Sequence, residues 1–171
     1  WERYETLSKG DQGMRGVPSG FPALDNLLAG FQKSDLIILA ARPSVGKTSL
    51  AMDIARNAAV KHNIPVGIFS LEMSSEQLVD RMLSAESKVN SWKIRTAAVR
   101  AEEDFEHIRV ALQTLSKAPI YIDDKPGSNI LAMRAVARRL KREHGIGLIV
   151  VDYLQLMAPT NTKSDNMVQQ V

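Results

Sequence analysis

One segment constrains the fold of this chain more than any other, because it joins an apolar run, a glycine-containing loop and the start of a helical pattern. The loop consists of Ala41, Arg42, Pro43, Ser44, Val45, Gly46, Lys47 and Thr48. The apolar residues 36–40 before it predict a strand, and apolar residues at 50, 54 and 58 recur at helical spacing after it. A strand that leads into a helix through such a loop is typical of an α/β fold.

The loop fits the phosphate-binding pattern G-x-x-x-x-G-K-[ST] at every position except the first, where Ala41 replaces glycine. In this pattern, backbone N–H groups and the helix N-terminus converge on phosphate oxygens, and the helix dipole favours negative charge there. We therefore expect residues 41–48 to bind a nucleotide, with Lys47 at the β and γ phosphates and the Thr48 hydroxyl on Mg²⁺. The alternative is an ordinary strand-to-helix turn whose lysine is solvated.

The rest of the chain continues the alternation of strands and helices. Apolar runs predict strands at 66–71, 120–123 and 148–152, and amphipathic patterns predict helices at 47–61, 75–85, near Trp92, at 102–116 and at 130–144. Short apolar strands separated by helices indicate a mainly parallel sheet with helices on both faces. The absence of cysteine excludes a disulfide framework and a thiolate metal site.

Acidic residues follow three of the predicted strands, namely Glu72, the pair Asp123 and Asp124, and Asp152. Ligands of parallel sheets bind beyond the carboxyl ends of the strands, so these acids are candidates for a site. Phosphoryl transfer to water requires one carboxylate for the metal and one that orients the attacking water. We expect Asp152, which follows the longest apolar run, to hold the metal. Glu72, whose side chain is one methylene longer, is expected to orient the water. Asp123 and Asp124 are interpreted as a cap or surface charges, and they are the alternative to Asp152.

Four motifs, taken together, resemble the DnaB-type replicative helicases over nearly the whole chain. They are Gly16-Val17-Pro18-Ser19-Gly20-Phe21 with Leu24-Asp25, the loop 41–48, Phe69-Ser70-Leu71-Glu72-Met73, and Val151-Asp152-Tyr153-Leu154-Gln155-Leu156-Met157. Alanine at the first loop position is that family's own version of the phosphate loop, so the departure at Ala41 agrees with the resemblance.

The resemblance implies the fold and chemistry of a RecA-like P-loop ATPase that uses ATP and Mg²⁺. Lys47 and Thr48 would hold the triphosphate and the metal, Lys47 and Glu72 would be catalytic, and Asp152 would be the second-motif aspartate at the metal. The family further implies a homohexameric ring that translocates on single-stranded DNA and unwinds duplex DNA, with primase and a helicase loader as possible partners.

The resemblance also implies an organisation in which residues 1–18 are the end of a linker helix, at 1–9, and a linker, and 19–171 are an incomplete ATPase core. Residues 167–171 read as the opening of a further helix. Members of the family continue with a γ-phosphate sensor glutamine, a DNA-binding loop and an arginine finger, so we expect residues 1–171 alone to hydrolyse ATP barely above background.

Two other functions are compatible with the same motifs. One is a RecA-like recombination or repair ATPase, and the other is an assembly module that binds nucleotide without turnover. The net charge of +3 decides little about a nucleic-acid partner, and the basic residues Arg134, Arg138 and Arg142 are interpreted as a solvated helix face, with DNA or a partner protein as the alternative. No apolar run approaches the ~20 residues of a membrane helix and no signal peptide is recognisable, so we expect a cytoplasmic protein.

Overall fold

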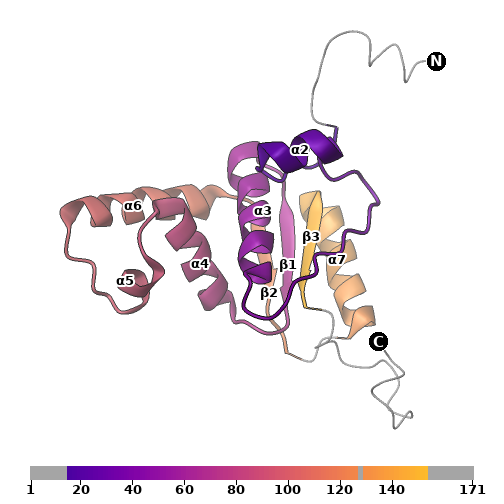
Figure 1. Cartoon of the computed structure of the whole chain (residues 1–171). Helices are drawn as coiled ribbons and strands as arrows, with labels where there is room; N and C mark the ends of the chain where they lie inside the picture. Colours follow the sequence, from indigo (N-terminus) through magenta and orange to yellow (C-terminus); the bar gives the residue numbers. More distant parts are fainter. Residues whose placement is uncertain (1–14, 127–128, 154–171) are drawn as a thin grey trace.

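The computed structural model describes residues 15–126 and 129–153, which form the strands and helices labelled in Figure 1. In chain order the elements are α2 (Pro22–Leu28), α3 (Lys47–His62), β1 (Val66–Ser70), α4 (Ser75–Ser87), α5 (Ser91–Arg95), α6 (Glu102–Lys117), β2 (Ile120–Asp123), α7 (Ile130–His144) and β3 (Leu148–Asp152). The expected helices at 1–9 and 167–171 lie outside the described residues.

The three strands form one parallel sheet in the order β2-β1-β3. In its register, Phe69 of β1 pairs with Asp123 of β2, and Ser70 of β1 pairs with Asp152 of β3. The carboxyl ends of all three strands therefore meet at one edge, and the acidic residues that follow them are brought to that edge.

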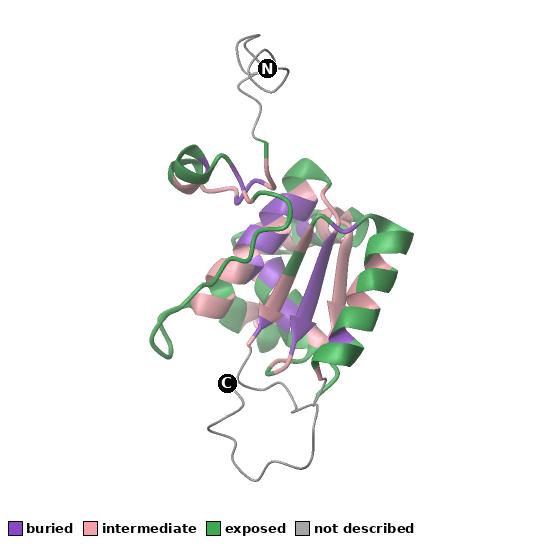
Figure 2. Cartoon of the chain, turned by 90° about the vertical axis from the view of Figure 1, so that its right-hand side faces the viewer, coloured by how far each residue is buried: buried purple, intermediate pink, exposed green. Residues whose placement is uncertain are grey.

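Helices cover both faces of this sheet, as the sequence predicts. Helix α3 contacts all three strands, and α4 packs against both α3 and α6, whereas α7 contacts β1. Figures 1 and 2 show α3 and α7 on opposite sides of the strands. None of the helices in the described residues is long and apolar enough to cross a membrane.

The core lies between β1 and α3, where every residue of β1 is buried (Figure 2). Val66 and Ile68 of β1 are 0% and 1% exposed, and Ala55 and Ala58 of α3 are fully covered. Small alanines allow the helix to approach the strand closely, and each buried Val or Ile contributes about 1.5–3 kcal/mol. This packing fixes the start of α3, and hence the phosphate loop, relative to the carboxyl end of the sheet.

The predicted strand at residues 36–40 is wrong, because the structure has no regular element there. Leu36 is 87% exposed and Ile38 is 73% exposed. A strand needs a neighbour that satisfies its backbone N–H and C=O groups, and within the part of the chain that the structure describes no strand pairs with this segment. The apolar pattern indicates strand propensity, but whether a strand forms depends on a neighbouring strand with which it can pair.

The other elements predicted within residues 15–126 and 129–153 are confirmed, with ends that differ by at most two residues. Helix α7 and strands β2 and β3 have the predicted bounds. Helix α7 starts after Asn129, whose side chain accepts from the Ala132 N–H, and ends before Gly145, which has a left-handed backbone. The short helix α2, with Pro22 in its first turn, was not predicted.

Candidate nucleotide-binding site

Three of the predicted site residues are in contact where the phosphate loop meets the end of β3. The Thr48 hydroxyl donates a hydrogen bond to Asp152 Oδ2 over 2.6 Å, although 104 residues separate them. Lys47 Nζ lies 3.5 Å from Asp152 Oδ1. Asp152 itself is 4% exposed. A buried carboxylate is stable when it is paired and hydrogen-bonded, and the first two residues of α3 provide both kinds of partner.

The loop before α3 has the backbone of an anion-binding turn. Ser44 and Gly46 both adopt left-handed conformations, with φ of 63° and 101°. Alternation of left- and right-handed residues turns successive N–H groups to one side, and the first N–H groups of α3 have no acceptor within the helix. Residues 41–46 are exposed, and a side chain at Gly46 would meet no atom within 4 Å. The loop is therefore open to a phosphate group.

The residues beside the loop fit a magnesium ion. The Thr48 hydroxyl and the Asp152 carboxylate offer only oxygen atoms, which Mg²⁺ prefers. Thr48 and Asp152 are therefore the residues of this site that would hold the ion.

The aromatic ring of Tyr153 is a further contact of Lys47 that the sequence did not reveal. Lys47 Nζ lies 4.1 Å from the ring centroid, which is a favourable position for a cation–π interaction. The ring and Asp152 together hold the ammonium group at the mouth of the loop. An aromatic residue directly after the strand-end acid was the available signal.

Glu72 is exposed on a turn that follows β1. Ser70 Oγ, which is buried, donates to the Met73 carbonyl over 2.7 Å and accepts from the Met73 N–H over 3.2 Å. The Leu71 N–H donates to the Asp152 carbonyl over 2.8 Å. The turn that carries Glu72 is thus hydrogen-bonded to the residue that contacts Lys47 and Thr48, while the role of Glu72 itself stays a prediction.

Asp123 and Asp124 make other contacts. Asp123 Oδ1 accepts from the Lys125 N–H over 3.2 Å, as in a turn. Asp124 Oδ2 accepts from the Ser75 N–H at the start of α4 over 2.7 Å, and this bond holds the pKa of Asp124 below its usual value. Of the acids at the strand ends, Asp152 is the one whose contacts suit the metal role.

The segment before α2 is held to α2 by a buried carboxylate and to α3 by a side-chain amide. Asp25 accepts from the Ser19 N–H over 2.7 Å and from the Gly20 N–H over 3.1 Å. Burial acts to raise the pKa of Asp25, but the hydrogen bonds from Ser19 and Gly20 outweigh it and the pKa is lowered. The Asn57 side chain of α3 donates to the Ser19 carbonyl over 3.3 Å.

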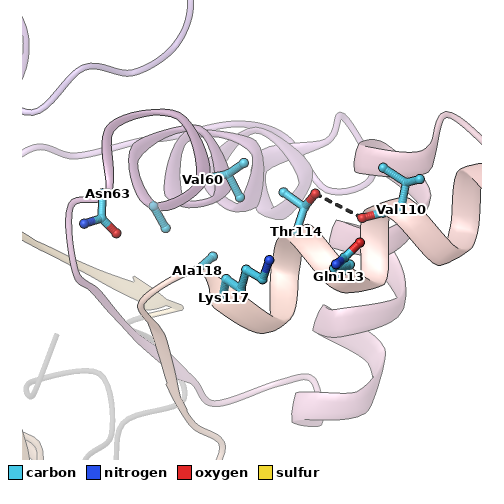
Figure 3. A pocket seen from close by; sticks show the side chains of 8 residues that line it. Val60, Asn63, Val110, Gln113, Thr114, Lys117 and Ala118 are labelled. Atoms are coloured by element: carbon cyan, nitrogen blue, oxygen red, sulfur yellow. Dashed lines mark hydrogen bonds between the residues drawn. The ribbon is translucent and has the colours of Figure 1, made fainter.

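A separate depression lies between the end of α3 and α6 (Figure 3). It has a volume of about 380 Å³ and is lined by side chains that include Val60, Asn63, Gln113 and Lys117. None of the predicted site residues lines this depression. The candidate site is therefore defined by the contacts among Lys47, Thr48 and Asp152 and not by this depression.

Comparisons with known proteins agree with the motifs. A family model described as the DnaB-like helicase C-terminal domain matches residues 16–171. Over 171 residues the chain is 48% identical to the replicative DNA helicase DnaB of Geobacillus stearothermophilus and 51% identical to the replicative DNA helicase DnaC of Bacillus subtilis strain 168. All of this chain is matched in both cases, and it spans 37% of the length of each relative.

Two solved structures have the same architecture. One, described as an ATPase domain, superposes with a TM-score of 0.89 at 32% identity, over 99% of this chain and 60% of that one. The other, a structure of a DnaB-like replicative helicase and its interactions with primase, gives the same TM-score and identity, over 99% of this chain and 42% of that one.

Proposed function

The chain belongs to the DnaB-like helicase C-terminal domain family, and from this premise we propose that it is the nucleotide-binding part of an ATP-driven DNA helicase motor. Its fold is the RecA-like α/β fold of the matched ATPase domains. One observation carries the proposal: the contact of Lys47 and Thr48 with Asp152 joins the phosphate loop to a strand-end carboxylate.

In this proposal the ligand is Mg·ATP, held by the loop 41–48 and the first turn of α3. The loop N–H groups and Lys47 would bind the phosphates, and Thr48 and Asp152 would hold the magnesium ion and its water. Magnesium, when bound, neutralises the charge that develops on the phosphates. Glu72, at the end of the neighbouring strand, orients the attacking water.

The proposal extends to the whole protein of which such a domain is part. It comprises a homohexamer that encircles single-stranded DNA in the cytoplasm and hydrolyses ATP as it moves. Primase is a candidate partner because one matched structure is of a DnaB-like helicase and its interactions with primase. A helicase loader, expected from the family resemblance, is a second candidate.

The test uses the full-length protein. We expect Mg²⁺-dependent ATP hydrolysis that single-stranded DNA stimulates, displacement of a strand from a forked duplex, and six-fold rings in electron micrographs. Helical filaments without strand displacement would favour a recombination ATPase instead. Nucleotide binding without hydrolysis, with or without DNA, would favour an assembly module, and either result would overturn the proposal.

A further inference from the structure

The turn that carries Glu72 is attached on both sides to strand ends of the sheet. On the β3 side, the Leu71 N–H bonds to the Asp152 carbonyl over 2.8 Å. On the β2 side, the Ser75 N–H bonds to the Asp124 carboxylate over 2.7 Å, a contact between residues 49 apart in the chain. Residues 71–75 therefore form a bridge, and Glu72 lies within it.

We propose that Asp124 is a positioning residue that fixes Glu72 through the start of helix α4. This inference rests on the proposed role of Glu72 in orienting the attacking water. The Asp152 carbonyl and Ser70 bond to Leu71 and Met73 of the turn, and the side chain of Asp124, directly after β2, bonds to its last residue, Ser75. Without Asp124, the turn would lose its hydrogen bond to the β2 side of the sheet, and its second half would be held only through the cap and the packing of α4.

A carboxylate is well suited to this position. Ser74 caps α4 by accepting from the Gln77 N–H, and Gln77 accepts from the Ser74 N–H in return. This reciprocal cap leaves the Ser75 N–H to an acceptor outside the helix, and Asp124 provides it with a negative charge that the helix dipole favours. The same hydrogen bond lowers the pKa of Asp124, as expected when the charged form of a carboxylate accepts it.

The consequence is a specific effect on turnover. Displacement of a catalytic group by about 1 Å can cost about 100-fold in rate. We therefore expect Asp124→Ala to lower kcat for ATP hydrolysis by about 10- to 100-fold, while KM and the Kd for Mg·ATP change less than about threefold, since residues 41–48 are untouched. Asp124→Asn retains an oxygen acceptor and should lose less than about fivefold.

A reciprocal variant removes the donor and leaves Asp124 intact. Ser75 is the first residue of α4, where proline is favoured, and Ser74 already has the extended backbone (φ −69°, ψ 157°) that proline requires before it. Ser75→Pro should therefore keep the helix and reproduce the kcat loss of Asp124→Ala. Asp123→Ala is the matched control, because it removes a carboxylate from the same strand end, and the Asp123 side chain accepts its hydrogen bond from Lys125 in its own turn.

The experiment measures these variants in the full-length protein beside Glu72→Gln and the double variant Glu72→Gln/Asp124→Ala. If Asp124 acts through Glu72, the double variant is within about twofold of Glu72→Gln, and Asp123→Ala resembles wild type. Normal kcat in both Asp124→Ala and Ser75→Pro, or losses that multiply in the double variant, would overturn the inference. If Asp124→Ala fails to fold, Ser75→Pro and Asp124→Asn decide it. Normal turnover by Glu72→Gln would instead refute the proposed role of Glu72.

Discussion

Replacement of Asp25 by alanine should destabilise the domain strongly, because this carboxylate is 6% exposed and accepts two backbone hydrogen bonds. A hydrogen bond to a charged group contributes about 1.5–3 kcal/mol, and a buried N–H left without an acceptor costs about 1–3 kcal/mol. Ser19, which is fully buried, would be left in that state. We expect Asp25→Ala to lower the free energy of unfolding by about 2–5 kcal/mol, and Asp25→Asn, with one acceptor oxygen, by about half as much.

Urea unfolding followed by circular dichroism measures this loss. With an m value of about 2 kcal/mol/M, the midpoint of Asp25→Ala should fall by about 1–2.5 M. Asp35→Ala is the control, since the Asp35 side chain is exposed and surface substitutions usually change stability by less than about 0.5 kcal/mol. A midpoint for Asp25→Ala equal to that of Asp35→Ala would refute the assignment of Asp25 as an anchor.

The same anchor predicts a dependence on pH. The pKa of Asp25 is lowered in the folded state, so its stabilisation is complete above the ordinary aspartate pKa of about 3.9 and is lost as the pH falls through the lower, folded value. The stability difference between wild type and Asp25→Ala should therefore be constant near neutral pH and shrink below about pH 4. A difference that shrank between pH 8 and 6 would contradict this explanation.

Two further substitutions test the contact of Gly20 with α3 and the turn that carries Glu72. Gly20→Ala should destabilise the fold by about 2–4 kcal/mol, because φ at Gly20 is +81° and an added Cβ would overlap Asn57. Gly145→Ala is the control, since φ is +69° there but the added Cβ meets no atom, and it should cost only about 1 kcal/mol. Equal losses for the two variants in thermal unfolding would refute the steric argument. Ser70→Ala should lower both stability, by about 1–3 kcal/mol, and kcat, because it removes the bonds to Met73, whereas Ser116→Ala on the exposed face of α6 should change neither.

The elements that sequence reasoning predicted best are those with local signals at both ends. Helix α7 has a capping asparagine before it and a glycine after it, and both signals can be recognised from the sequence alone. Residues 36–40 carry an equally clear apolar signal, but whether they form a strand depends on a neighbour that local sequence does not identify.

In the candidate site, too, some contacts could be predicted from local sequence and others could not. Asp152 could be predicted because the carboxyl ends of parallel strands meet, and the structure brings it to Lys47 and Thr48. The bond between Asp124 and Ser75 could not, because it depends on the register of β1 against β2 and on where α4 begins. Local pattern predicts which residues lie at the edge of the sheet, and tertiary packing decides which of them touch.

The most direct test of the nucleotide site is a titration of the full-length protein with Mg·ATP, comparing wild type with Lys47→Ala and with Lys61→Ala. Lys47 belongs to the loop, whereas Lys61 is an exposed lysine near the other end of the same helix. Loss of a charge-assisted contact worth about 1.5–3 kcal/mol should weaken binding by about 10- to 150-fold in Lys47→Ala and leave Lys61→Ala unchanged. Equal affinity in all three proteins would show that residues 41–48 do not bind the triphosphate.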